Sequence, residues 1–195
     1  MEKEIILVVC AYLIGSIPTG LLLAKAFGGV DIRSAGSGNI GATNVYRTMG
    51  RKVGLLTLLG DCMKGVIPVV AAKSLGLPVA WVALVGLSAF LGHVYTIFLG
   101  FKGGKGVATA LGVFLAASPW AVLAALVIFS LVLYKWRYVS LASITAAALM
   151  PSLVALLYKQ PAMVGMTLVI AALVIFKHRE NIQRLKAGTE NKFKA

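Results

Sequence analysis

Residues 5–26 read IILVVCAYLIGSIPTGLLLAKA, an apolar run with one charged residue, Lys25, near its end. A helix needs about 20 such residues to cross the hydrocarbon core of a bilayer. The run therefore predicts a membrane-spanning helix. Pro18 predicts a kink within it, because proline removes a backbone donor and clashes with the preceding turn. The residues before the run lack a basic segment and no small-residue cleavage site follows it, so we expect the helix to be retained.

The composition extends this prediction to the whole chain. Of its 195 residues, 59% are hydrophobic and only 13% are charged, whereas about a quarter of a soluble domain is charged. We predict a single polytopic membrane domain over residues 1–195. A net charge of +13 is also typical of nucleic-acid-binding proteins. Here the basic residues lie between apolar runs, so we expect membrane lipid and an anionic substrate as partners and no nucleic acid.

The apolar runs predict an all-α bundle of seven transmembrane helices. The fourth is short, and it could begin within the preceding glycines or be a half-span beside a cavity. A polar loop, 27–52, separates the first two. The seven predicted spans are 5–26, 53–73, 79–99, 107–117, 120–134, 139–157 and 162–176.

Seven spans place the two ends of the chain on opposite sides, and the basic residues then divide unequally. On the side of the first polar loop lie Lys25, Arg33, Arg47, Arg51, Lys52, Lys102, Lys105, Lys135, Arg137, Lys177, Arg179, Arg184, Lys186, Lys192 and Lys194. On the other side lie only Lys3, Lys73 and Lys159. The richer side is expected to be cytoplasmic. We therefore predict a multi-pass protein of the cell (inner) membrane with its N-terminus outside, its C-terminus inside and its polar motifs at the cytoplasmic face.

The first polar motif is residues 36–47, GSGNIGATNVYR. It can bury little apolar surface, but it offers backbone N–H groups, two hydroxyls, two carboxamides and one guanidinium. Glycines let a backbone approach a phosphate closely, and Arg47 could hold one with two parallel hydrogen bonds. The motif predicts an anion cradle; the alternative is a flexible linker.

The second polar motif is residues 102–109, KGGKGVAT. Two lysines among three glycines suit a second phosphate. The spacing is not that of a nucleotide-binding P-loop, so we do not expect nucleotide hydrolysis.

Other polar residues lie within or beside the spans. His178 and Asn181 would share one helix face if the last span continues, either as site residues or as part of a basic lipid anchor. Asp61 and Lys64 share one face of the second span and predict either a structural ion pair or a pair that supports the site. His93 is expected to be a satisfied interior histidine.

The sequence lacks the residue patterns that several kinds of catalytic site require. Cys10 and Cys62 lie in apolar runs without metal-ligand spacing, and we expect neither a metal nor a cofactor. There is no G-x-S-x-G elbow, and the predicted cytoplasmic segments offer no pair of carboxylates that could act as acid and base. An already activated substrate would suit such a site.

These motifs, in this order, resemble the PlsY family, the bacterial acyl-phosphate:glycerol-3-phosphate acyltransferases. Residues 37–47 resemble its first motif and residues 102–109 its second. Residues 178–185, with Gly188 and Glu190, resemble its third, and residues 138–143 also match. One departure is Thr96, where we would expect proline.

The resemblance implies transfer of an acyl group from acyl phosphate to glycerol 3-phosphate. The products would be 1-acylglycerol 3-phosphate (lysophosphatidate) and inorganic phosphate, in the first acylation of phospholipid synthesis. Such a reaction needs mainly positioning and charge neutralisation. The alternative is a membrane transporter for an organic phosphate. It is less favoured because transporters bind near the midplane between repeats, and no internal repeat is visible.

The resemblance also assigns roles to residues. Ser37, Lys105, His178 and Asn181 are the expected catalytic residues, and the last two would orient the attacking hydroxyl. The expected substrate-binding residues are Gly36, Gly38, Asn39, Gly41, Thr43, Asn44, Arg47, Gly103, Gly104 and Ser143. A phosphate oxygen of the donor is the expected acceptor of the proton, with His178 as the alternative base.

Overall fold

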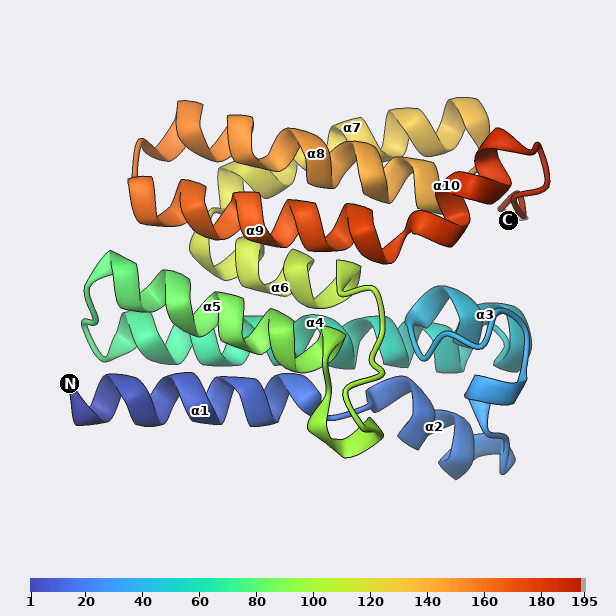
Figure 1. Cartoon of the computed structure of the whole chain (residues 1–195), viewed down its shortest axis with the longest axis horizontal. Coiled ribbons are helices and arrows are strands. Elements are labelled where there is room, and N and C mark those ends of the chain that lie inside the picture. Colours follow the sequence, from blue (N-terminus) through green and yellow to red (C-terminus); the bar gives the residue numbers. More distant parts are fainter. Residues whose placement is uncertain (194–195) are drawn as a thin grey trace. The chain divides into compact units, whose positions relative to one another are not determined.

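A computed structural model describes residues 1–193, so Lys194 of the basic set lies outside it. Over these residues the chain forms α-helices and two short 3-10 helices, and no strand. The prediction of an all-α protein is confirmed. The helices group into two compact units, Met1–Ala117 and Ser118–Ala195 (Figure 1). The prediction of a single domain stays a prediction.

Unit 1 contains the first six helices. They are α1 (Glu2–Ser16), α2 (Thr19–Gly28), α3 (Ala42–Met49), α4 (Arg51–Ser74), α5 (Val79–Val94) and α6 (Val107–Ala117), with 3-10 helices η1 (Ile32–Ser34) and η2 (Ile97–Leu99). Helix α5 packs against α1, α4 and α6, and α4 packs along α6. Helices α2 and α3 both pack on α4. Figure 1 shows α2 and α3 beyond the end of α1.

Unit 2 contains the last four helices. They are α7 (Pro119–Trp136), α8 (Val139–Tyr158), α9 (Pro161–Lys177) and α10 (Arg179–Lys186). Helix α8 packs against both α7 and α9. The axis bends by 55° between α9 and α10, with His178 between them. His178 and Asn181 were expected to share one helix face if the last span continues; this condition is not met, because α9 ends before His178.

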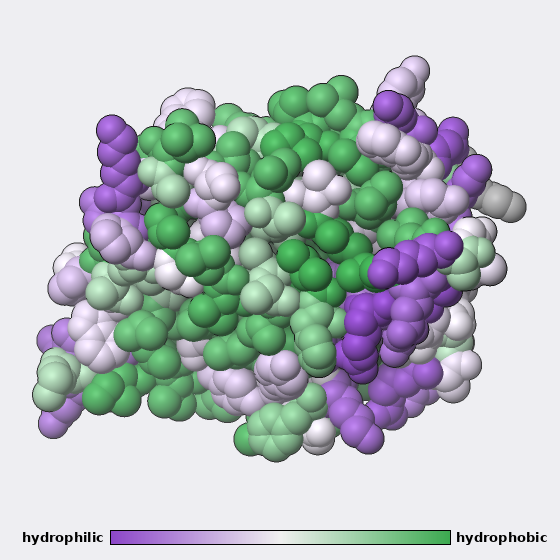
Figure 2. All heavy atoms as spheres, turned by 45° about the horizontal axis from the view of Figure 1, so that its top comes forward, coloured by the Kyte–Doolittle hydropathy of each residue, from purple (hydrophilic) through white to green (hydrophobic). Residues whose placement is uncertain are grey.

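Five segments are long and apolar enough to cross a membrane, and α9 with α10 makes a sixth if the bent pair is one span. Helix α6 is apolar but has only 11 residues. Large apolar side chains are exposed along the helices, for example Leu131 and Leu156. Figure 2 shows such residues over the middle of the helices and hydrophilic residues near the helix ends. The chain is therefore a multi-pass membrane protein, and the count of seven crossings stays a prediction.

The kink predicted at Pro18 is a complete break. Helix α1 ends at Ser16 and α2 begins at Thr19. Two carbonyl groups at the break accept hydrogen bonds from side chains of other segments. Thr96 Oγ1 donates to the Ser16 oxygen (2.5 Å), and Lys64 Nζ donates to the Ile17 oxygen (2.7 Å). The break is thus held by polar side chains that replace the missing helical bonds.

The polar segment after α2 is more ordered than predicted. Residues 42–49 form α3, so the prediction of a loop throughout 27–52 is wrong. The expectation that this motif buries little apolar surface is also wrong. Ile40 is 5% exposed and Val45 is fully buried, in a cluster with Leu21, Ala24 and Ile32. This small core decides the local fold, because it attaches the motif to α2 and α4.

Thr96 provides a test of how the break is held. Replacing it with valine keeps the shape but leaves the Ser16 oxygen without this donor, which should cost about 1–2 kcal/mol. Replacing it with proline also loses the bond. However, Thr96 has φ −65°, the angle that a proline ring imposes, so proline should recover about 0.4–1 kcal/mol through a less flexible unfolded chain.

We therefore expect thermal unfolding midpoints in detergent to rank wild type above Thr96→Pro, and Thr96→Pro above Thr96→Val. A midpoint for Thr96→Val equal to that of the wild type would contradict a stabilising bond to Ser16.

Candidate functional site

Asn44 holds the first loop, which we define as residues 36–41. Its side chain lies in the first turn of α3 and is only 3% exposed. Its Oδ1 accepts from the Ser37 N–H at 2.8 Å. Its Nδ2 donates to the carbonyl oxygens of Ile32, Ala35 and Asn39 at 3.3, 3.0 and 2.9 Å. One buried carboxamide thus fixes four backbone groups, which is inconsistent with a flexible linker.

Glycine is required at Gly36. Its φ is +60°, and a Cβ there would lie 2.3 Å from Asn44 Oδ1. Gly38 also has a positive φ, of 69°. At the end of the loop, Asn39 Oδ1 accepts from the Gly41 N–H at 2.8 Å. The glycines therefore let the loop close around Asn44.

The outer side of this segment carries the other predicted residues. Ser37, Thr43 and Arg47 are exposed, the last two on α3. N–H groups in the first turn of a helix lack intrahelical partners and favour anions. The structure thus joins the predicted residues 36–47 into one loop and helix start, and Asn44 acts there as an internal pin.

The second loop, which we define as residues 102–106, lies against the end of α5. Gly103 N–H donates to the Val94 oxygen, and Gly104 N–H to the His93 oxygen, both at 3.2 Å. A Cβ on Gly104 would lie 2.3 Å from His93 Nε2. The glycines therefore let the backbone lie directly on His93. Lys105, in the same loop, is partly buried.

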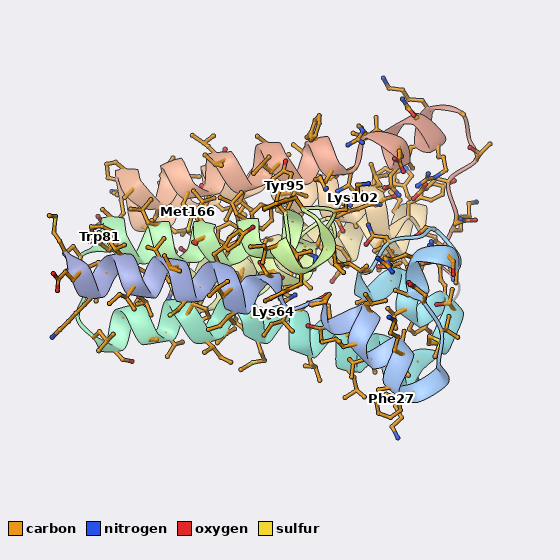
Figure 3. The ribbon with its side chains drawn as sticks, turned by 60° about the horizontal axis from the view of Figure 1, so that its bottom comes forward. Phe27, Lys64, Trp81, Tyr95, Lys102 and Met166 are labelled. Atoms are coloured by element: carbon orange, nitrogen blue, oxygen red, sulfur yellow. The ribbon has the colours of Figure 1, made fainter. Side chains whose placement is uncertain are left out.

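A buried charge cluster of Asp61, Lys64 and His93 lies beneath the second loop. Their exposed fractions are 1%, 5% and 3%. Lys64 Nζ is 2.8 Å from Asp61 Oδ1 and 3.1 Å from His93 Nδ1. The predicted ion pair is confirmed, and His93 is an interior histidine that joins it. Figure 3 shows Lys64 near the place where α1 ends.

The hydrogen bond from Lys64 determines which ring nitrogen of His93 carries the proton. An ammonium group only donates hydrogen bonds, so His93 Nδ1 accepts from Lys64 and the ring proton lies on Nε2. Nε2 is the atom nearest Gly104. Lys64 thereby sets both the orientation and the tautomer of the ring on which the second loop rests.

In unit 2, Glu190 gathers a tail cluster with Ser140, Asn181 and Arg184. Its Oε1 accepts from Ser140 Oγ and Asn181 Nδ2, and its Oε2 from Arg184 Nε, each at 2.7 Å. Burial alone would raise the pKa of Glu190, but the three hydrogen bonds and the Arg184 charge lower it overall. A carboxylate that stays ionised thus ties the C-terminal tail to α8 and α10.

His178 and Asn181 stand at the bend with fixed orientations. His178 is 3% exposed, and its Nδ1 donates to the Val174 oxygen at 2.7 Å. A carbonyl only accepts, so the neutral ring carries its proton on Nδ1 and presents Nε2 as an acceptor. Because Asn181 Nδ2 donates to Glu190, its Oδ1 points to the opposite side. Ser143 is 5% exposed and donates to the Val139 oxygen at 2.8 Å.

The predicted residues divide between the units: the two loops and α3 belong to unit 1, and Ser143, His178 and Asn181 to unit 2. Sequence reasoning missed the connections of Glu190, although only six acidic residues exist and two of them, Glu180 and Glu190, fall in the third motif. Within residues 1–193, no group of three or more His, Cys, Asp or Glu is placed to hold a metal ion.

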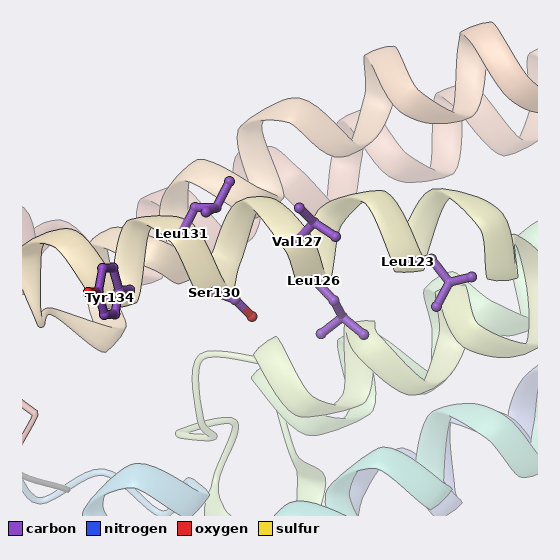
Figure 4. A pocket seen from close by; sticks show the side chains of 6 residues that line it. All are labelled: Leu123, Leu126, Val127, Ser130, Leu131 and Tyr134. Atoms are coloured by element: carbon purple, nitrogen blue, oxygen red, sulfur yellow. The ribbon is translucent and has the colours of Figure 1, made fainter.

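An apolar depression on α7 contains none of the predicted residues. Figure 4 shows the side chains that line it, all from that helix. They are Leu123, Leu126, Val127, Ser130, Leu131 and Tyr134. It has no charged group and only the hydroxyls of Ser130 and Tyr134, so it suits lipid chains and not phosphate chemistry.

The tail cluster should make stability depend on pH. Since the folded-state pKa of Glu190 is lowered, its contribution is complete above the pKa of an unfolded glutamate, about 4.3. The contribution is lost as pH falls through the lower folded value. Glu190→Gln lacks the charge that pairs with Arg184.

We expect the unfolding midpoint of Glu190→Gln to lie below that of the wild type above about pH 5, with a gap that shrinks on acidification. Glu180→Gln is the control, because Glu180 is an exposed glutamate on the nearby helix α10. A gap that does not change with pH would contradict the role of the charge.

Comparison with known proteins shows the family and the fold of the chain. The family profile described as "Glycerol-3-phosphate acyltransferase" matches residues 5–188. Proteins of that name from Geotalea daltonii and Geobacter metallireducens are 70% and 71% identical to the chain. Each alignment covers the full length of this chain and of the relative.

Two solved structures of PlsY (YgiH), an integral membrane glycerol 3-phosphate acyltransferase, share the fold. The glycerol 3-phosphate form gives a TM-score of 0.93 and the lysophosphatidic acid form 0.90. Each is 46% identical to the chain, over 98% of this chain and 96% of the other.

Proposed function

This chain belongs to the glycerol-3-phosphate acyltransferase family, and we propose that its acyl donor is an acyl phosphate. The products are then lysophosphatidate and inorganic phosphate. The match of the family profile over residues 5–188 carries the family assignment. The donor is proposed because the three motifs resemble those of the acyl-phosphate-dependent acyltransferases. A transporter of organic phosphates is not favoured, because the full-length relatives are acyltransferases.

The chemistry suits a site without a protein nucleophile. A hydroxyl oxygen of glycerol 3-phosphate attacks the acyl carbon and forms the ester bond. The bond between that carbon and the phosphate oxygen breaks, and phosphate leaves with the electron pair. The hydroxyl proton passes to an oxygen of the departing phosphate. The protein then needs only to orient the two substrates and to neutralise their charge.

In unit 1, the two glycine-rich loops supply the groups that bind phosphate. Ser37, Gly38 and Asn39 in the first loop and Lys105 in the second bind phosphate groups, and Arg47 holds glycerol 3-phosphate. The fixed first loop, the start of α3 and the positive charges support these roles. Gly36, Gly41, Gly103 and Gly104 allow the backbone path, Thr43 adds a hydroxyl, and Asn44 keeps the loop in shape.

In unit 2, His178 and Asn181 orient the attacking hydroxyl, and Ser143 helps to hold glycerol 3-phosphate. The acceptor state of His178 Nε2 and the fixed amide of Asn181 support this role, because a hydroxyl needs acceptors for its proton. The same Nε2 makes His178 the alternative base.

The helices and the distribution of charge support a membrane topology. We propose seven crossings, by α1 with α2, α4, α5, α6, α7, α8 and α9. The excess of basic residues on the side of both loops and the tail favours a cytoplasmic active face, an outer N-terminus and an inner C-terminus.

The donor can be tested directly. Purified protein in detergent receives glycerol 3-phosphate with either acyl phosphate or the same acyl chain on coenzyme A. We expect equal amounts of lysophosphatidate and phosphate from acyl phosphate, and no product from the thioester. Turnover with the thioester alone would contradict the donor assignment, and binding without turnover would favour a transporter.

The path of the proton can be tested at His178. If His178 only orients the hydroxyl, His178→Gln should lower kcat by about tenfold or less and raise KM for glycerol 3-phosphate. A general base contributes about 10²–10⁴ in rate. A loss of kcat of that size with unchanged KM would therefore identify His178 as the base. Gln183→Ala, at an exposed position of α10, is the control.

A further inference from the structure

We propose that the buried charge cluster positions the second loop for acyl transfer, so that Asp61, Lys64 and His93 are positioning residues. The inference rests on the proposed function in one respect, which is that Lys105 binds a substrate phosphate. None of the three belongs to the glycine-rich motifs or to the third motif. Each is at least 95% buried within unit 1.

Stability alone does not account for such a cluster. Taking a carboxylate and an ammonium out of water is costly, and replacing a buried ion pair by apolar side chains of similar size is often neutral or stabilising. Ionisable residues inside membrane-spanning segments are costly for the same reason. The charges on α4 therefore need a function other than holding helices together.

The contacts lead from the cluster to the second loop without a gap. Asp61 and Lys64 lie on one face of α4, and Lys64 Nζ reaches His93 Nδ1 on α5. The His93 ring then lies against Gly104, and the His93 carbonyl accepts the N–H of the same residue. Lys105 is the next residue. A rotation of the His93 ring would thus displace the backbone that carries Lys105.

The buried charge cluster is also connected to the first loop. Lys64 Nζ donates to the Ile17 oxygen in the break before α2. Three residues later, Gly20 packs so closely on the Ile40 oxygen that a Cβ would lie 2.0 Å from it. Ile40 is part of the first loop. One ammonium group therefore connects the supports of both glycine-rich loops in unit 1.

The first experiment separates positioning from stability. The double variant Asp61→Leu/Lys64→Met removes both charges together and leaves no unpaired one. The variant also loses the hydrogen bond from Lys64 to the Ile17 oxygen, so we expect its unfolding midpoint to fall about as far as that of Thr96→Val, while kcat/KM falls 10- to 100-fold. The control is Lys73→Met, since Lys73 lies on the same helix but is exposed, and its Nζ donates to the Ala116 oxygen on the neighbouring helix α6. A double variant with kcat/KM within twofold of the wild type would overturn the proposal.

The second experiment stays decisive if that variant does not fold. Gly104→Ala forces the His93 ring aside, and His93→Ala removes the ring and makes room for the new methyl group. Positioning through the ring predicts that the two losses of kcat do not add. The double variant should then be no slower than the slower single variant. Independent, multiplicative losses of kcat would overturn the proposal.

These outcomes remain distinct from failure of the proposed function. The wild type is assayed in the same preparation with both acyl donors, and the variants are compared with the donor that yields lysophosphatidate. Wild-type enzyme that acylates glycerol 3-phosphate beside an equally active double variant would overturn the positioning role alone. Wild-type enzyme without any acylation would refute the proposed function.

Discussion

The hydrogen bonds of Lys64 Nζ join three polar groups in the interior of unit 1 and fix their orientations. In an apolar helix every polar group must find a partner inside the protein. Lys64 meets this requirement for Asp61, for His93 and for the carbonyl that the break at Pro18 leaves at Ile17. The break allows the chain to leave α1 and build the first loop on α2. The second loop rests on the His93 ring that the same ammonium group orients.

In unit 2 the Glu190 carboxylate satisfies buried polar groups, as the Lys64 ammonium group does in unit 1. Glu190 returns from the C-terminal tail and accepts from groups on α8 and α10, so that Asn181 and the bend after α9 have fixed orientations. In both units a buried ion pairs with an opposite charge and also orients neutral polar side chains that would otherwise rotate. Preorganised groups of this kind suit a reaction whose substrate already carries a good leaving group, since the catalyst must then orient and neutralise more than it must attack.

Much of the fold could be predicted from the sequence, because membrane helices follow from apolar length alone. The predicted fourth span, 107–117, has the bounds of α6, and the kink at Pro18 is present as a break. Helix α3 was missed because it has only eight residues, lies between Gly41 and Gly50, and contains few apolar residues around the buried Val45. The pin at Asn44 and the bonds of Glu190 were missed because they join residues that only the folded chain brings together. The sequence indicated that Asp61 and Lys64 pair, but not that His93 completes the cluster.

The central claim is that both loops are already fixed before substrate binds. Amide hydrogen exchange of the unliganded protein in detergent tests it most directly, at Ser37 in the first loop and at Gly103 and Gly104 in the second. Their N–H groups donate to Asn44, Val94 and His93, so we predict exchange at least tenfold slower than in an unstructured peptide. Exchange at the unstructured rate, with protection appearing only after glycerol 3-phosphate is added, would contradict the account.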